Sequence, residues 1–197
     1  MAISTSEIKQ LRDATGVGMM DAKRALEEAD GDQVKALEVL RKKGQAKAEK
    51  RAERTADAGL VDSYVHMGRV AAMVEVNCET DFVARTDDFK DFVRDVAMQV
   101  AAANPQYLKP DSVPESVVAK EKEIYTGELE GKPENIREQI LSGKLDKFYE
   151  QACLYKQPFI KDPDKTIEAY QTELVARLGE NIVIAQFARM ELGVHES

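Results

Sequence analysis

Three stretches of the chain show the pattern of β-strands, in which side chains point alternately to a buried and an exposed face. Residues 59–65 and 69–78 are separated by the turn pair Met67-Gly68, which predicts an antiparallel hairpin. Residues 181–192 can pair with this hairpin as a closing strand. One face of the second strand is apolar at Val70, Ala72, Val74, Val76 and Cys78. The pattern therefore predicts a three-stranded antiparallel sheet.

Helical spacing, with apolar residues three and four positions apart, begins beyond Thr86. A helix is predicted over residues 87–103, ending at Asn104-Pro105 because the residue before a proline avoids the helical conformation. A second helix is predicted over residues 115–128 and should stop near Gly131. The first of these helices has a continuous apolar stripe made of Phe89, Phe92, Val93, Val96 and Val100.

The second half of the chain predicts two further helices. One begins at Pro133, a favoured first residue of a helix, and Gly143 should interrupt it. Residues 157–163 are expected to form an irregular connector. Thr166 should cap the last helix and Gly179 should end it. The inward side chains expected on these two helices are Ile136, Ile140, Leu141, Ile167, Tyr170, Leu174 and Leu178.

Before the strands, three short helices with tight turns are predicted within about the first 43 residues. Thr5 should cap the first, over residues 6–14, and the second covers residues 20–29. Asp32 should cap the third. Their expected inward residues are Ile8, Leu11, Ala22, Ala25, Leu26, Val34, Leu37, Val39 and Leu40. These elements describe a small helical bundle.

Residues 44–58 mix alanines with Lys47, Lys50, Arg51 and Arg54. The simpler interpretation is a solvated helix that acts as a spacer. The alternative is a basic strip that helps to dock an acidic partner. We therefore expect an α+β protein with two domains. Residues 1–54 would form the bundle with its basic helical linker, and residues 55–197 the core with its small sheet packed by helices.

The connection between the second strand and the following helix is the tetrapeptide Thr80-Asp81-Phe82-Val83. An acidic residue followed by a large aromatic one can project outward together at this corner, because the strand and the helix hold the connection at both ends. In the alternative interpretation, Thr80 caps a short turn and Phe82 folds back into the core.

The turn Gly16-Val17-Gly18 is not a phosphate-binding loop, because no strand precedes it and no Gly-Lys-Ser/Thr follows. Its glycines serve the turn between two helices. Met19 and Met20 follow, and two adjacent side chains cannot both face one core. One of the pair is expected in the core and the other on an adaptable contact surface.

Charge is unevenly distributed over the 197 residues. The formal net charge is −8, with 12 Lys and Arg against 10 Asp and Glu in residues 1–56, and 16 against 26 in the remainder. An acidic bulk argues against nucleic acid as the main partner. With 43% hydrophobic and 32% charged residues, the composition is that of a folded protein.

Candidate chemistry is scarce. The two histidines, His66 and His195, lie at no suggestive distance from a nucleophile or an acid. Cys78 and Cys153 give neither a disulfide framework nor a metal spacing. We therefore expect no enzyme, no metal and no cofactor. Asp87-Asp88 could serve acid–base chemistry, but their place at a helix start is explained by the helix dipole.

No apolar run approaches the about 20 residues that a membrane helix needs, so no membrane partner is expected. The first five residues contain neither an apolar signal core nor an arginine-rich transit pattern. These features favour the cytoplasm.

Two long motifs resemble signatures of the elongation factor Ts family. They are Leu11-Arg12-Asp13-Ala14-Thr15-Gly16-Val17-Gly18-Met19-Met20-Asp21-Ala22-Lys23-Arg24-Ala25-Leu26 and Glu75-Val76-Asn77-Cys78-Glu79-Thr80-Asp81-Phe82-Val83-Ala84-Arg85. The resemblance implies an N-terminal three-helix domain of the ubiquitin-associated type. It also implies a short form of the family, with one copy of the core that longer members carry twice.

The resemblance implies a guanine-nucleotide exchange factor that binds elongation factor Tu·GDP and does not itself bind nucleotide. Two groups of residues would bind the partner: Arg12, Val17, Met19, Met20 and Lys23 on the bundle, and Thr80, Asp81, Phe82 and Val83 at the corner. The corner residues would also dislodge Mg²⁺ from the partner. The alternative function is a ribosome- or RNA-associated module that uses the basic residues 41–54.

The small sheet also predicts a possible homodimer. Helices can cover one face, while the other still has apolar residues: Ala71, Met73, Val183 and Phe187. Longer relatives would bury the equivalent surface against their second core copy, so two single-core chains could pair sheet to sheet about a twofold axis.

Overall fold

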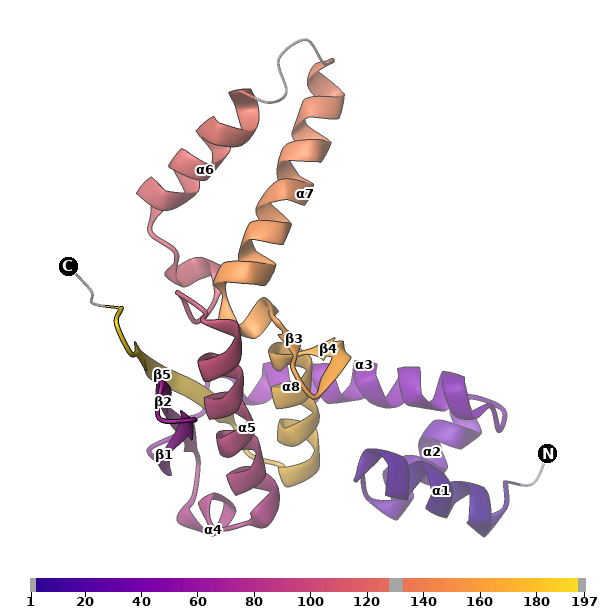
Figure 1. Cartoon of the computed structure of the whole chain (residues 1–197). Helices are drawn as coiled ribbons and strands as arrows, with labels where there is room; N and C mark the ends of the chain where they lie inside the picture. Colours follow the sequence, from indigo (N-terminus) through magenta and orange to yellow (C-terminus); the bar gives the residue numbers. More distant parts are fainter. Residues whose placement is uncertain (1–2, 128–132, 195–197) are drawn as a thin grey trace. The chain divides into compact units, whose positions relative to one another are not determined.

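The computed structural model describes residues 3–127 and 133–194 and has an α+β fold (Figure 1). N-terminal helices come first, followed by a small three-stranded antiparallel sheet packed with helices, as predicted. Contacts gather the chain into two compact units. The first contains residues up to Leu60, with Val76–Phe92 and Ala169–Ala185, and the second contains the rest. The expected domain boundary after residue 54 stays a prediction.

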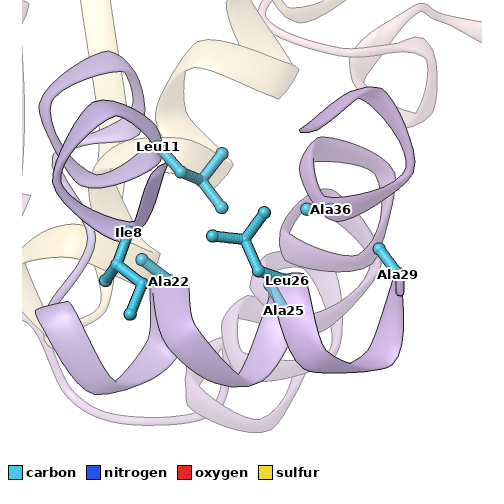
Figure 2. Close-up of a cluster of buried hydrophobic side chains, with 7 residues drawn as sticks. All are labelled: Ile8, Leu11, Ala22, Ala25, Leu26, Ala29 and Ala36. Carbon is cyan, nitrogen blue, oxygen red and sulfur yellow. The ribbon is translucent and has the colours of Figure 1, made fainter. Parts of the chain in front are cut away.

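Helices α1 (Thr5–Thr15), α2 (Met19–Glu28) and α3 (Gln33–Arg51) form the predicted bundle. In Figure 2, Leu11 and Leu26 point toward each other from α1 and α2. The remaining core residues are mostly alanines, whose small side chains allow the helices to approach closely. The buried cluster consists of Ile8, Leu11, Ala22, Ala25, Leu26, Ala29 and Ala36.

The cap of α1 lies one residue earlier than predicted, at Ser4 in place of Thr5. Ser4 Oγ accepts from the Glu7 backbone N–H at 3.2 Å, and the Glu7 carboxylate accepts from the Ser4 N–H at 2.7 Å. This reciprocal capping box satisfies two donors at the helix start. The predicted cap of α3 is confirmed, since Asp32 Oδ1 accepts from the backbone of Val34 at 2.9 Å.

Helix α3 differs from its prediction in two respects. Val34 and Leu37 are 68% and 40% exposed, because Ala36 takes the inward position in this turn. The helix also continues into the first half of the expected solvated spacer, to Arg51, and that part is not free of contacts. Gly44 is buried, and a Cβ added there would lie 3.4 Å from the Ala176 Cβ in α8 (Ile167–Leu178).

The sheet consists of β1 (Ala58–His66), β2 (Val70–Cys78) and β5 (Ile182–Glu191), in the order β1-β2-β5. Met67 and Gly68 both have positive φ, 49° and 66°, as a two-residue hairpin turn requires. The apolar face predicted for β2 is confirmed: Val70 is half-buried, and the buried members are Ala72, Val74, Val76 and Cys78.

Helix α5 (Asp87–Ala103) buries its entire predicted stripe. A short 3₁₀ turn, η1 (Pro110–Ser112), leads to α6 (Glu115–Gly127). The helix stop expected near Gly131 lies outside the described residues.

Helix α7 (Glu134–Ala152) is continuous, so the interruption predicted at Gly143 is wrong. A single glycine inside a helix costs only about 1 kcal/mol relative to alanine, which long helices tolerate. Ile136 is 41% exposed and does not face inward, while Ile140 and Leu141 are half-buried.

The expected irregular connector is also wrong, because it contains a two-stranded antiparallel sheet. After η2 (Leu154–Lys156), β3 (Pro158–Phe159) pairs with β4 (Asp162–Thr166). Such short strands show no periodicity that sequence reasoning can detect. Helix α8 (Ile167–Leu178) follows and ends at Gly179, as predicted.

A buried glutamine holds this small sheet in place. Gln99 on α5 donates through Nε2 to Gln157 Oε1 at 3.1 Å and to the Pro158 carbonyl at 3.2 Å. Its Oε1 accepts from the Ile160 backbone N–H at 2.9 Å. Gln99 therefore satisfies backbone groups of a segment that has little regular structure of its own.

We expect Gln99→Leu to lower the free energy of unfolding by about 1–3 kcal/mol, because it removes the partner of the buried Gln157 side-chain oxygen and of two partly buried backbone groups. Urea unfolding followed by circular dichroism measures this change. The matched control is Gln10→Leu at an exposed position of α1, which should change stability by less than about 0.5 kcal/mol. Equal unfolding midpoints for both variants would contradict the assignment.

Candidate partner-binding site

The tetrapeptide Thr80–Val83, called the corner below, lies between the end of β2 and the start of α5. Its last three residues belong to α4 (Asp81–Ala84), a helix of four residues. Thr80 is extended, with φ −132° and ψ 154°, and its Oγ1 accepts from the Val83 backbone N–H at 3.4 Å. The predicted capping role of Thr80 is therefore confirmed.

The structure decides between the two interpretations of Phe82. Its side chain is 78% exposed, so it projects outward and does not fold back into the core. Ala84 is the buried residue of α4, at 4% exposure. The short helix thus rests on a small side chain and presents a large aromatic one to solvent.

The other corner residues are held by local contacts. Asp81 is exposed and its carboxylate pairs with Arg85 at 2.6 Å, one helical turn away. Val83 is half-buried, and its carbonyl accepts from the Thr86 N–H at 3.0 Å and the Thr86 hydroxyl at 2.8 Å. Thr86 Oγ1 in turn accepts from the Phe89 N–H at 3.3 Å, which links the corner to α5.

A distant segment also holds the corner, and sequence reasoning did not find it. The Glu180 carboxylate accepts from the Thr80 N–H at 3.0 Å and from its hydroxyl at 2.6 Å, across 100 residues of sequence. The adjacent Asn181 donates its backbone N–H to Glu79 Oε1 at 2.7 Å. No periodicity or motif links residues so far apart, so no signal in one sequence could have indicated this pairing.

Cys78 lies directly before this contact. It is a free, buried cysteine whose Sγ donates to the Thr80 carbonyl at 3.1 Å. Burial, together with the negative charge of Glu180, raises the pKa of the Cys78 thiol above its ordinary value. The thiol therefore stays protonated at neutral pH and can act as a donor. Burial likewise raises the pKa of Cys153.

The second group of predicted site residues lies around the α1–α2 turn. Met19 and Met20 are 41% and 63% exposed, so the expectation that one of them faces the core is wrong. Lys23 lies one turn further along α2 and is exposed, paired with Glu27. Arg12 is exposed at the end of α1, and Val17 packs partly against the bundle core.

The basic residues 41–54 are partly neutralised by acids. Lys47 Nζ lies 3.3 Å from Asp21, Arg54 lies 3.5 Å from Glu79, and Lys43 pairs with Glu28. These ion pairs offset part of the positive charge on which the RNA-binding alternative depends.

Within residues 3–127 and 133–194, no group of three His, Cys, Asp or Glu side chains could hold a metal ion. In the same residues, no helix is long and apolar enough to span a membrane. Asp87 and Asp88 occupy the first turn of α5, as acids at a helix start commonly do, and Asp88 pairs with Arg177 at 3.4 Å.

Comparison with known proteins identifies the family. Residues 21–194 match the family model described as Elongation factor TS. The chain belongs to the elongation factor Ts family. It is therefore a translation elongation factor and not a catalyst of covalent chemistry.

The relatives match over almost their whole length. Elongation factor Ts of Carboxydothermus hydrogenoformans is 53% identical over 194 residues, which cover 97% of this chain and 89% of the relative. The elongation factor Ts proteins of Thermodesulfovibrio yellowstonii and Thermotoga maritima are 50% and 53% identical, with 98% of each chain covered. The signature containing the corner lies entirely within the residues that match the elongation factor Ts model.

Proposed function

We propose that this chain is a guanine-nucleotide exchange factor that binds elongation factor Tu·GDP and promotes the release of GDP. The observation that carries the proposal is the exposure of Phe82, 78%, on a short helix fixed at both ends. A large aromatic side chain so exposed on a supported corner has the character of an interface anchor.

The proposed mechanism requires no covalent step. A GTPase holds its nucleotide partly through Mg²⁺, which bridges phosphate oxygens to the protein. Phe82 would wedge between helices near that site, while Thr80, Asp81 and Val83 complete the surface that dislodges the ion. Asp81 would compete for the polar contacts that position the metal. Release follows if the exchange factor binds the nucleotide-free partner more tightly than the loaded one.

The bundle would supply most of the affinity. Met19 and Met20 precede Lys23 on α2 by four and three residues, so each lies next to Lys23 on the helix surface. Arg12 is exposed near the end of α1, and Val17 is half-buried in the turn that leads to Met19. The chain itself would bind no nucleotide, and we place it in the cytoplasm, where elongation takes place.

We also propose that the free protein is a homodimer joined sheet to sheet. In the second compact unit, Val61, Val65 and Met73 are 64%, 60% and 54% exposed on the hairpin strands. Among the four residues on which the dimer expectation was based, Val183 is also exposed, at 36%, while Ala71 and Phe187 are half-buried. So much apolar surface on a small sheet is typical of an interface.

Phe82→Ala should lower the stimulated rate of GDP release from elongation factor Tu by about tenfold or more, since truncating an aromatic anchor costs about 2 kcal/mol. Asp81→Ala should have a smaller effect in the same direction. Fluorescent GDP release measures the rate, and circular dichroism of the same sample confirms the fold. Ile124→Ala, which truncates a half-exposed side chain on α6, is the control. A wild-type release rate for Phe82→Ala would refute the wedge.

The double variant Met19→Ala, Met20→Ala should weaken the complex with elongation factor Tu by about tenfold or more, because it removes two adaptable contact side chains. The release rate at saturating exchange factor should change little. Val34→Ala with Leu37→Ala, on the exposed side of α3, is the matched control. Unchanged affinity in a calorimetric titration would contradict the division of roles between bundle and corner.

Light scattering across a dilution series should give the mass of a dimer at micromolar concentration and dissociation on dilution, as mass action requires. Met73→Lys should shift the equilibrium to the monomer, because it places a charge in the apolar contact. A monomer mass for the unaltered chain throughout the series would refute the homodimer.

A further inference from the structure

Glu180 occupies the connection between α8 and β5, directly after the left-handed Gly179 (φ 81°). Its two carboxylate oxygens accept from two groups of the same residue, the N–H and the hydroxyl of Thr80, at 3.0 and 2.6 Å. Hydrogen bonds to a charged acceptor are shorter and stronger than neutral ones. This pair therefore fixes both the backbone and the side chain of Thr80.

Helix α4 depends on that fixation because four residues cannot stabilise a helix. The first turn of a helix fixes several residues for a single hydrogen bond, and here that bond runs from Ala84 N–H to the Thr80 carbonyl at 3.2 Å. The exposed Phe82 contributes little burial to hold the turn. Thr80 therefore fixes the N-terminal end of the turn that carries Phe82, as Thr86 fixes its C-terminal end.

The neighbouring residues extend the same contact. Asn181 N–H binds Glu79 Oε1 at 2.7 Å, so two successive residues of one segment hold two successive residues of the other. Asn181 Nδ2 also donates to the Arg54 carbonyl at 2.8 Å, and Arg54 lies 3.5 Å from Glu79. These contacts make the support of Thr80 a three-segment junction in which Glu180 is the member bound to the corner.

We propose that Glu180 is a positioning residue for nucleotide release, which holds Thr80 so that Phe82 is presented in the orientation used against the partner. This inference rests on the proposed exchange function and adds to it a residue outside the family signature quoted above. Without Glu180, the corner would have to become ordered each time the protein binds its partner. The entropy cost of this ordering would slow nucleotide release, the step in which Phe82 acts.

The experiment measures fluorescent GDP release from elongation factor Tu over a range of exchange-factor concentrations. Glu180→Ala should lower the maximal rate about tenfold, as the loss of about 1.4 kcal/mol predicts. The half-saturating concentration should stay within about twofold, because the bundle supplies the affinity. Glu180→Gln should give an intermediate rate, since its amide can still bond Thr80, but without charge. Glu168→Ala, which removes the carboxylate paired with Lys156, should match the wild type.

Hydrogen exchange of the free protein gives a readout independent of nucleotide release. Glu180→Ala should increase exchange in a peptide covering residues 79–88 and leave peptides of α1 and α2 unchanged. If the wild-type chain fails to stimulate release, the proposed function is wrong, while this measurement still tests the contact with Thr80.

The inference is overturned if Glu180→Ala releases GDP at the wild-type maximal rate, or if only its half-saturating concentration changes. Unaltered protection of residues 79–88 would overturn it as well. Should Glu180→Ala not fold, Glu180→Gln decides the matter. A maximal rate reduced about two- to threefold supports the positioning role, and a wild-type rate refutes it.

Discussion

The bond between the Glu180 carboxylate and Thr80 is the constraint on which the corner depends. Every polar backbone group of Thr80 is used: its N–H by Glu180, and its carbonyl by Ala84 and by the Cys78 thiol. The residue is thereby fixed from both sides. Because the backbone before it is fixed, the Phe82 side chain can have a defined orientation without packing contacts of its own. This explains how Phe82 can be both exposed and oriented.

Two of the exposed apolar surfaces, at Met19-Met20 and at Phe82, differ in character. Met19 and Met20 have unbranched, flexible side chains, and they lie on α2 of the bundle, whose core is made largely of alanine. Phe82 is a rigid ring on a short turn with a prescribed orientation. An adaptable surface suits binding to a partner in more than one state, whereas a rigid projection suits the selection of one state over another. The proposed exchange function would use both properties, because it changes the partner through differential affinity alone.

Local periodicity explains what the sequence could predict. Two such patterns are confirmed: the alternation that ends at Val74, Val76 and Cys78, and the helical stripe of α5. Each depends only on residues a few positions apart, so it can be recognised in the sequence. The outward Phe82 was one of two open interpretations, since exposure depends on what surrounds the corner. Glu180 and Asn181 could not be found, because their partners lie about 100 residues away.

The errors have similar physical causes. Val34 and Leu37 fit a helical period, but the smaller Ala36 is the residue that fits between closely packed helices. Gly143 was given too much weight as a helix breaker, although its cost is spread over a helix of 19 residues. The segment that contains β3 is held by Gln99, a residue more than 50 positions earlier, which no local pattern could indicate.

The position of β5 in the sheet has a consequence for biosynthesis. β2 pairs with β1 next to it in sequence and with β5, whose residues are made about 100 positions later. Domains fold from the N-terminus during synthesis, so the bundle and the hairpin can form while one edge of β2 is still unpaired. Glu180 emerges after α8 and just before β5, so the contact that holds Thr80 can form only after about 100 further residues have been made. A nascent chain of this translation factor thus forms the helices proposed to bind the partner before the contact that orients Phe82.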